Sequence, residues 1–516
     1  MLRKSKTIYL YPSGEDSQAA FIILEQIKKF FAIKAIEFID DGSHLTSLEN
    51  CQNPIKKNGE LWIIHQDKSV YDKLVLNAKN LDIEFFNGIQ KCEELLFACF
   101  GKINKEESYK EKKESFYLLN YMAYFILHFF ISLRQDGVFL QEFFALVRKK
   151  EKSFKKQLKI KQDTIGIQRT SFGSNKHLGE IANKLEEKNI KIAYIYGEED
   201  LYLKEREFYK DKCIFFPLQS SYFGCFLNLF KFYVTCLMPH TTPEGGTKYI
   251  YVPHAFIDPI ATLAQRKRPL DAFYFKRKMG INGYRIISSL SNFKIYKEGF
   301  KGSGYEEELV CGGYPSLDLN IKEYQEYRVN SSGGGGDILI AINKKENLAI
   351  IDSFLEEFKE RFSLKHKVYF RPYPGNIAKQ ENLKIIEKYQ NQPWFIYDKT
   401  QKLSAEIMHR CCVLIGDHSS LVYTFALTCL KPVILLFKEV LENEFAGVRF
   451  VNPLLHKMAS NKEEMFQKLE EIFNEDLRQK KIRQEAIQKY REKEVFHLGK
   501  SSEFIANFIA RKCEEK

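Results

Sequence analysis

Short apolar runs alternate with amphipathic stretches through the first hundred residues. The apolar runs of strand length are Thr7–Leu10, Ala35–Ile39, Leu61–Ile64 and Ile83–Phe86. Between the first two, Gln18–Phe31 places apolar side chains at the three- and four-residue spacing of a helix. This strand–helix–strand rhythm predicts a small parallel α/β unit over residues 1–103, of unknown role.

Polar residues follow the predicted strands of this unit. Ser13 and Asp16 come after the first strand, and Asp40 and Asp41 come after the second. The carboxyl ends of parallel strands form the ligand-binding edge of an open sheet. Two interpretations therefore stand, a ligand site at this edge and ordinary loop polarity.

Residues 104–165 have a helical, basic pattern and are predicted to connect this unit to a second α/β segment, residues 166–330. The predicted strands of that segment are Ile192–Tyr196, Cys213–Pro217, Tyr249–Val252, Arg285–Ser289 and Glu308–Cys311. The apolar stretch Tyr222–Met238 is predicted to be a helix.

Two serines and four glycines at 331–336 interrupt the pattern and predict a flexible linker. A third α/β segment follows at 337–460, and residues 461–516 are predicted to be helical. The predicted strands are Asp337–Ile342, Val368–Phe370, Phe395–Tyr397, Val413–Ile415 and Val433–Phe437, and the predicted helices are Leu348–Arg361, Ser404–His409 and Ser420–Thr428. Two α/β halves joined by a linker indicate a two-lobed enzyme with a cleft between the lobes.

Composition excludes several classes of protein. Hydrophobic residues make up 44% and charged residues 28% of the 516 residues, which excludes a disordered chain and a collagen. The 11 cysteines include no C-x-x-C pair, so we expect neither a zinc site nor a disulfide framework, but reduced thiols in the cytoplasm. The apolar stretches Tyr117–Ile131 and Tyr222–Met238 are too short or too polar to span a bilayer.

The net charge of +12 is concentrated in one place. Residues 148–161 hold eight Lys or Arg and one Glu. One interpretation is a solvated helix face or linker. The other is docking to an anionic membrane surface, which would make this cytoplasmic protein peripheral on the inner face of the membrane. No nucleic-acid motif accompanies the segment, so we expect no nucleic-acid partner.

The stretch 413–423 is the most informative for chemistry. An apolar strand leads through a short polar turn into an apolar helix, with Ser419 or Ser420 at the N-cap position. Free N–H groups and the positive end of the helix dipole make such a start a natural phosphate site. A serine that only caps the helix is the alternative.

Five segments resemble motifs of the CDP-glycerol glycerophosphotransferase family, the teichoic-acid-type polymerases and primases. Gly416–Ser420 resembles Thr-Asp-Tyr-Ser-Ser, and Lys431-Pro432 follows at the matching distance. The other segments are Gly313–Asp318, which resembles Gly-Tyr-Pro-Arg-Asn-Asp, Phe370–Pro374, which resembles Arg-x-His-Pro, and Val252–Ala255, which resembles Trp-His-Gly. The resemblance covers roughly residues 190–455.

The resemblance implies a GT-B fold, a GT-B-like pair of Rossmann-like lobes, here preceded by the extra N-terminal α/β unit. It implies that Ser419 and Ser420 hold the phosphates of a nucleotide donor and that Asp417 orders their turn. It also implies that Arg371 contacts a donor diphosphate or an acceptor phosphate. His254 would be the general base, because an unperturbed imidazole titrates near neutrality.

The sequence departs from the family pattern at two histidine positions. Tyr373 replaces the histidine of Arg-x-His-Pro, where a phenol can donate a hydrogen bond to a leaving phosphate. His418 replaces the tyrosine of the Ser-Ser motif and joins the predicted donor site.

The leading hypothesis is a transferase that moves a glycerol-phosphate-like or related group from a cytidine-nucleotide donor to a cell-surface glycan or lipid-linked precursor. The donor is a substrate, and neither a cofactor nor a metal is expected. Alternatives are a GT-B glycosyltransferase that uses a CMP-linked acidic sugar (Kdo or a sialic-type acid), a non-catalytic GT-B scaffold protein, and a sugar-nucleotide epimerase of the same fold.

Overall fold

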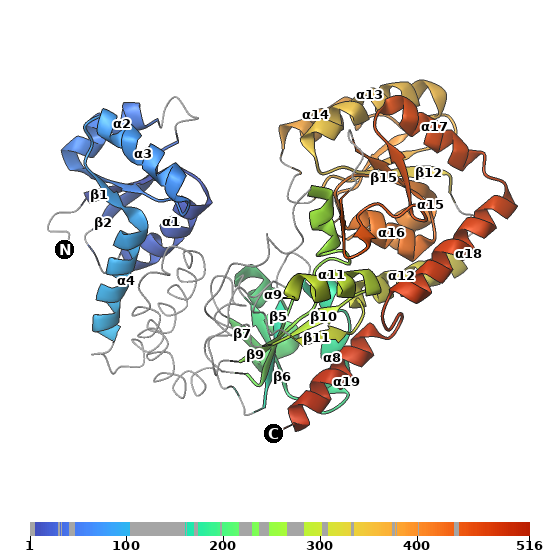
Figure 1. The fold of residues 1–516 in the computed structure, drawn as a ribbon, viewed down its shortest axis with the longest axis horizontal. Coiled ribbons are helices and arrows are strands. Elements are labelled where there is room, and N and C mark those ends of the chain that lie inside the picture. The colour runs from blue at the N-terminus through green and yellow to red at the C-terminus, as the bar shows by residue number, and fades with distance from the viewer. Residues whose placement is uncertain are drawn as a thin grey trace. The chain divides into compact units, whose positions relative to one another are not determined.

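A computed structural model gives the fold of the chain (Figure 1). It describes residues 6–28, 31, 33–40, 47–103, 160, 163–169, 174–196, 199–215, 230–236, 247–265, 283–301, 308–331, 335–373, 377, 379–400, 402–437 and 443–515. The apolar stretch Tyr117–Ile131 and, apart from residue 160, the basic segment 148–161 lie outside these residues. Two compact units form, one from residues 1–162, 193–233 and 239–247 and the other from 163–192, 234–238 and 248–516.

The N-terminal residues form the predicted parallel α/β unit. Its four-stranded sheet has the order β2-β1-β3-β4 and is parallel throughout. The strands are β1 (Lys6–Tyr11), β2 (Ile33–Phe38), β3 (Gly59–Ile63) and β4 (Phe85–Asn87), and the helices are α1 (Glu15–Ile27), α2 (Leu48–Asn58), α3 (Lys68–Asn80) and α4 (Gly88–Ile103). Tyr9, Tyr11, Leu61 and Ile63 are buried in its core.

A seven-stranded sheet follows, in the order β11-β10-β9-β8-β5-β6-β7. The strands are β5 (Ile165–Arg169), β6 (Ile192–Tyr196), β7 (Cys213–Phe215), β8 (Phe232–Thr235), β9 (Lys248–Tyr251), β10 (Gly283–Ile287) and β11 (Glu308–Cys311). The accompanying helices are α7 (Ser174–Leu178), α8 (Ile181–Glu186), α9 (Glu199–Tyr209), the 3₁₀ helices η3 (Lys210–Lys212) and η4 (Ile260–Gln265), α11 (Leu290–Phe300) and α12 (Pro315–Val329). Numbered in chain order with β5 as strand 1, the sheet reads 3-2-1-4-5-6-7 from β7 across to β11. This is the Rossmann order 3-2-1-4-5-6 with one added strand.

Two elements of this sheet differ from the sequence predictions. The predicted helix Tyr222–Met238 is wrong at Phe232–Thr235, which is the buried strand β8. All four residues of β8 are buried, and a strand buried on both faces is apolar throughout, so its pattern cannot be distinguished from that of a buried helix. Strand β5 was not predicted, although Ile165–Gly166–Ile167–Gln168 is buried throughout.

The third sheet contains six strands in the order β14-β13-β12-β15-β16-β19, and it is parallel throughout. The strands are β12 (Asp337–Ala341), β13 (Val368–Phe370), β14 (Phe395–Tyr397), β15 (Cys411–Gly416), β16 (Val433–Leu436) and β19 (His456–Ala459), with a hairpin formed by β17 (Glu444–Phe445) and β18 (Val448–Arg449). In chain order this is the 3-2-1-4-5-6 arrangement of a Rossmann fold, and its order reverses between β12 and β15.

Helices cover both faces of this six-stranded sheet (Figure 1). They are α13 (Lys345–Arg361), α14 (Gln380–Tyr389), α15 (Ala405–Arg410), α16 (Leu421–Cys429) and α17 (Lys462–Phe473). Alternate residues of strand β12 enter different cores. Ile338 and Ile340 pack into the core beneath α13, whereas Leu339 packs into the core that contains α16. A parallel sheet buried on both faces requires such continuous apolar strands.

The C-terminal helices pack against helices of both lobes. Helix α18 (Leu477–Glu494) packs against α16, and α19 (Ser501–Glu514) packs against α8. Between them, the Asp318 carboxylate accepts hydrogen bonds from the backbone N–H groups of Gly499 and Ser501, at 2.7 and 2.8 Å. The predicted fold class is thereby confirmed as α/β, with a GT-B-like pair of Rossmann-like lobes after an N-terminal α/β unit. None of the described helices has the length and apolar composition needed to cross a membrane.

Candidate functional site

The predicted base His254 is three residues beyond the end of β9 and is half-exposed. Its Nδ1 atom lies 3.1 Å from the Tyr251 hydroxyl and 3.5 Å from Oδ2 of Asp258, which is buried. The Tyr251 hydroxyl donates a hydrogen bond of 2.7 Å to that same Oδ2. Because this hydroxyl gives its proton to Asp258, it can only accept from His254. Nδ1 therefore carries the imidazole proton, and the lone pair is on Nε2, as a general base requires.

Tyr251 keeps its proton because of where it lies. It is fully buried at the end of β9, and the Arg285 guanidinium is 4.6 Å from the centre of its ring. Burial and the neighbouring Asp258 carboxylate raise the pKa of Tyr251, so the hydroxyl remains a donor at neutral pH. The Tyr251 hydroxyl therefore continues to donate to Asp258 and to accept from His254.

A second histidine, His177 on α7, lies beside His254 and was missed from the sequence. Its Nδ1 atom is 2.9 Å from the Tyr314 hydroxyl, which donates a 3.3 Å hydrogen bond to the His254 carbonyl oxygen. The two imidazole rings are edge to face, with centroids 6.4 Å apart. Burial, followed by the nearby Lys176 and His254, lowers the pKa of His177 to about 2, so this ring is neutral. A Lys-His pair just after the unpredicted strand β5 was the available signal.

These contacts also account for the tyrosine of the Gly-Tyr-Pro segment. Tyr314 is buried at the start of α12, and its hydroxyl connects His177 with the main chain of His254. It therefore fixes the backbone from which the candidate base projects.

In the six-stranded lobe, Arg371 follows β13 and is buried. Its Nη1 atom forms a buried ion pair with Asp398 and donates to the Thr400 hydroxyl at 2.9 Å. Asp398 in turn accepts from the Thr400 backbone N–H at 2.9 Å, so the loop after β14 orients the guanidinium. Tyr373, two residues further along the chain, is 57% exposed.

Asp417 joins the two loops at which the strand order reverses. Its buried carboxylate accepts from the backbone N–H groups of Asn343 and Lys344, each at 2.9 Å, and from the Asn347 amide at 3.1 Å. The first two residues follow β12, whereas Asp417 follows β15. Burial raises the pKa of Asp417, although these hydrogen bonds oppose that shift. The carboxylate thus joins the turn after β15 to the loop after β12.

The neighbouring serines differ in their contacts. Ser420 has the N-cap position of α16 but makes no capping bond with its side chain, whereas the Ser419 hydroxyl accepts from the Leu421 N–H at 3.1 Å. Ser419 is therefore the residue that caps the helix. Ser420 is half-buried at the same helix start, and the start of a helix favours an anion.

His418 connects the two lobes. Its Nε2 atom is 2.9 Å from the Ala261 carbonyl oxygen in η4, and its ring stacks on Phe450. A second hydrogen bond joins the Asn443 amide to the Leu263 carbonyl oxygen at 2.9 Å. The first bond holds the segment that follows His254 against the turn that precedes α16, and the second joins the same segment to the residue before β17.

The Lys-Pro segment has a structural explanation. The Lys431 ammonium donates to the carbonyl oxygens of Met408, His409 and Cys411 at 2.7–2.9 Å. Lys431 therefore satisfies carbonyl groups at the C-terminal end of α15 that have no hydrogen-bond donor within the helix.

The carboxyl edge of the N-terminal unit is also joined by a carboxylate. Asp16 accepts from the backbone N–H of Gln66 at 3.0 Å and from its side-chain amide at 2.8 Å. These bonds connect the start of α1, which follows β1, to the loop after β3, where that sheet reverses its order. Asp41 lies outside the described residues, so the two interpretations of this edge stand as predictions.

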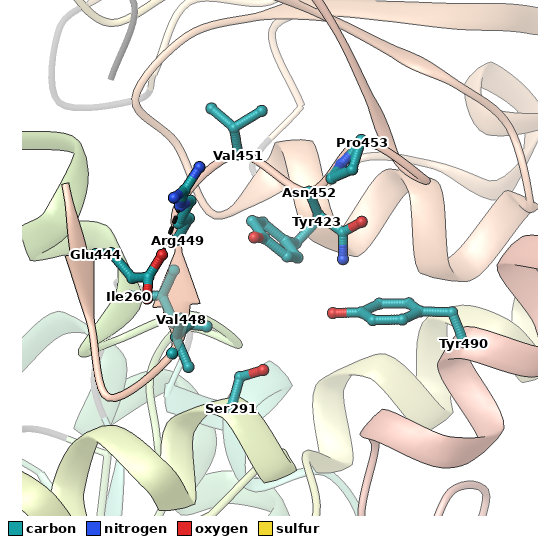
Figure 2. A pocket seen from close by; sticks show the side chains of 11 residues that line it. Ile260, Ser291, Tyr423, Glu444, Val448, Arg449, Val451, Asn452, Pro453 and Tyr490 are labelled. Atoms are coloured by element: carbon teal, nitrogen blue, oxygen red, sulfur yellow. Dashed lines mark hydrogen bonds and ion pairs between the residues drawn. The ribbon is translucent and has the colours of Figure 1, made fainter. Parts of the chain in front are cut away.

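A cavity of about 270 Å³ lies beside the contact between the lobes (Figure 2). It is lined by Ile260, Ser291, Tyr423, Glu444, Gly447, Val448, Arg449, Val451, Asn452, Pro453 and Tyr490. Figure 2 shows the hydroxyls of Ser291 and Tyr490 directed into it, and Glu444 paired with Arg449 at 2.8 Å. None of the predicted site residues lines this cavity.

The structure thus defines a class, a GT-B-like α/β protein with candidate residues at the carboxyl ends of strands in both lobes. No protein-family model and no curated protein matches the chain. Among solved structures, one of the wall teichoic acid polymerase TagF, soaked with CDPG, is 14% identical and has a TM-score of 0.49, covering 74% of this chain and 97% of that one.

Two further matches are a UDP-GlcNAc 2-epimerase and a HepE protein. The UDP-GlcNAc 2-epimerase of Methanocaldococcus jannaschii, in complex with UDP-GlcNAc and UDP, is 13% identical with a TM-score of 0.44, over 67% of this chain and 99% of that one. Anabaena HepE, in complex with UDP and glucose, is 11% identical with a TM-score of 0.40, over 68% and 100%.

Proposed function

We propose that this protein is a transferase that moves a glycerol-phosphate-like or related group from a cytidine-nucleotide donor to a hydroxyl of a cell-surface glycan or lipid-linked precursor. The observation that carries the proposal is the Asp258–Tyr251–His254 chain, which leaves Nε2 of a half-exposed histidine able to accept a proton. The motifs that resemble the glycerophosphotransferase family supply the choice of donor.

The proposed reaction begins when Nε2 of His254 takes the proton of the acceptor hydroxyl. The acceptor oxygen then forms a bond to phosphorus, the bond from phosphorus to the oxygen of CMP breaks, and CMP leaves. The imidazolium that forms is stabilised by the Asp258 carboxylate, which is 3.5 Å from Nδ1. The Tyr373 hydroxyl would donate to the departing phosphate.

The donor phosphates would bind at the carboxyl edge of the six-stranded sheet. Arg371 follows β13, and Ser419 and Ser420 follow β15, with β12 between the two. Two strand spacings of about 4.8 Å separate the ends of β13 and β15, so the edge is wide enough for a diphosphate. The N–H groups at the start of α16 and the Arg371 guanidinium would neutralise charge that develops at phosphorus.

A glycosyltransferase that uses a CMP-linked acidic sugar is the second candidate. Tyr373 is compatible with it, because a phenol that hydrogen-bonds to a departing phosphate suits attack at a sugar carbon as well as attack at phosphorus. His254 would be the base in this reaction too.

A donor panel tests the proposal. The purified full-length chain is given CDP-glycerol, CMP-Kdo or CMP-sialic acid with a lipid-linked glycan acceptor, and CMP release is measured. The proposal predicts release from CDP-glycerol. Release from the CMP-sugars alone would contradict it in favour of the glycosyltransferase, and release from none would favour a non-catalytic scaffold.

A further inference from the structure

Lys176 is a half-buried lysine at the point where the seven-stranded sheet reverses its order. It lies on α7, just after β5, and Cys236, just after β8, is close enough to influence its charge. Strands β5 and β8 are neighbours at the reversal, and the Gln168 and Thr235 side chains are hydrogen-bonded across them. In Rossmann-type sheets the crevice at this position is where ligands bind.

The basic side chains that lower the pKa of Lys176 are those of Arg371 and Lys402. Burial lowers the pKa of the Lys176 ammonium, and the positive charges of Arg371 and Lys402 lower it further. Cys236 supplies no negative charge, because burial raises the pKa of its thiol to about 12.

The other two cations have carboxylate partners. Arg371 is paired with Asp398, and Lys402 is paired with Glu323 at 2.5 Å. Within the ranges that the structure describes, Lys176 has neither an ion pair nor a hydrogen bond. An ammonium that is partly removed from water without a counter-charge destabilises the folded protein. A bound anion would remove that cost.

The position of Lys176 relative to the candidate site identifies the anion. Its neighbour His177 is bonded to Tyr314, which is bonded to the main chain of His254. Arg371, which follows β13 of the six-stranded lobe, is close enough for its positive charge to lower the pKa of Lys176. An anion held by Lys176 would therefore be near both the candidate base and the candidate phosphate-binding arginine.

We propose that Lys176 binds a phosphate group in the crevice at the β5–β8 reversal. The phosphate belongs either to the nucleotide donor or to a phosphorylated acceptor. The proposal deepens the proposed function and rests on it only for the identity of the molecule that carries the phosphate.

Calorimetric titration of the full-length chain tests the site without requiring turnover. The probes are CDP, CMP, and glycerol 3-phosphate added in the presence of CMP. Lys176→Met keeps the aliphatic stem and removes the charge. Lys184→Met on α8 is the matched control, because Lys184 forms only a surface ion pair with Glu187 at 2.9 Å.

We expect Lys176→Met to weaken a phosphate probe by about tenfold to a hundredfold, the usual effect of losing a hydrogen bond to a charged group, and Lys184→Met to change binding by less than about twofold. Loss with CDP or CMP assigns the site to the donor, and loss with glycerol 3-phosphate alone assigns it to the acceptor. Binding of all three probes that is unchanged in Lys176→Met, or no binding of any probe to the wild type, would overturn the proposal.

Thermal denaturation separates a ligand site from a structural role. If Lys176 awaits an anion, Lys176→Met should raise Tm in the absence of probe, and CDP should stabilise the wild type more than the variant. A lower Tm in the variant, with equal stabilisation by the probes, would mean that the lysine only supports the fold. These readouts remain valid if the donor panel shows no transfer.

Discussion

The Nε2 atom of His418 lies 2.9 Å from the carbonyl oxygen of Ala261. A carbonyl oxygen only accepts, so His418 must donate through Nε2. His418 therefore forms a hydrogen bond between the two lobes. It holds the segment after His254 against the turn that carries Ser419 and Ser420.

We expect His418→Ala to lower the free energy of unfolding by about 1 kcal/mol, because one hydrogen bond and the stacking on Phe450 are lost. The KM for the donor should rise, since the turn before α16 loses its contact with η4. Urea unfolding and initial-rate kinetics measure the two effects. His418→Gln, which retains a donor, should be closer to the wild type, and an equal loss in both variants would argue against this role.

Asp258 is expected to act by orienting and stabilising His254. Asp258→Asn should lower kcat by about tenfold to a hundredfold with little change in KM, because the partner of the imidazolium loses its charge. Tyr251→Phe should also lower kcat, since Nδ1 then lacks its 3.1 Å hydrogen-bond partner. Steady-state kinetics with saturating acceptor separates kcat from KM, and a change confined to KM would show that these residues bind substrate instead.

Stability should fall as the pH drops below about 6.5, the value for histidine in an unfolded chain. Burial lowers the pKa of His177 to about 2 and that of His456 to about 3, so only the unfolded chain takes up these protons between pH 6.5 and 3. Each histidine then costs the folded state about 1.4 kcal/mol per pH unit well below 6.5.

Urea unfolding between pH 7.5 and 5.5 measures this slope. Asp318 and Asp417, whose pKa values are raised mainly by burial, act in the opposite direction. His456→Gln should remove about half of the slope that His177 and His456 contribute together, and His497, whose pKa burial also lowers, adds to the remainder. An identical slope in wild type and variant would show that His456 is not the source.

The basic segment 148–161 lies outside the described residues apart from residue 160, and its membrane role stands as a prediction. A variant with Lys149, Lys150, Lys155 and Lys156 changed to Gln should bind vesicles of phosphatidylglycerol at least about a hundredfold more weakly, at about 1 kcal/mol per residue. Co-sedimentation at two salt concentrations measures the binding. Equal sedimentation of variant and wild type would favour the solvated linker.

Much of the six-stranded lobe was predictable because its strands are continuous apolar runs bounded by turns. Val368–Phe370 and Phe395–Tyr397 agree with β13 and β14 to the residue. Strand β8 was not predictable, because a strand buried on both faces carries no alternation. Because strand β5 was not predicted from the sequence, the Lys176-His177 pair that follows it was not recognised as part of a site.

The candidate site was predictable only as far as local motifs extend. The sequence placed Asp417 in an ordered turn and His254 at a strand end. It could not show that Ser419 rather than Ser420 caps α16, because that choice depends on backbone angles within one turn. The pairing of His177 with Tyr314 joins residues 137 positions apart, and only the folded chain brings them together.

The most direct test of the central claim is the rate of CMP release from CDP-glycerol by the wild type and by His254→Ala. Tyr373→Phe and a substitution in the N-terminal unit, His65→Ala, are the comparisons. We expect a loss of about a hundredfold or more for His254→Ala, the usual contribution of a general base, and a rate near that of the wild type for His65→Ala. CMP release by His254→Ala at the wild-type rate, with the variant folded, would contradict it.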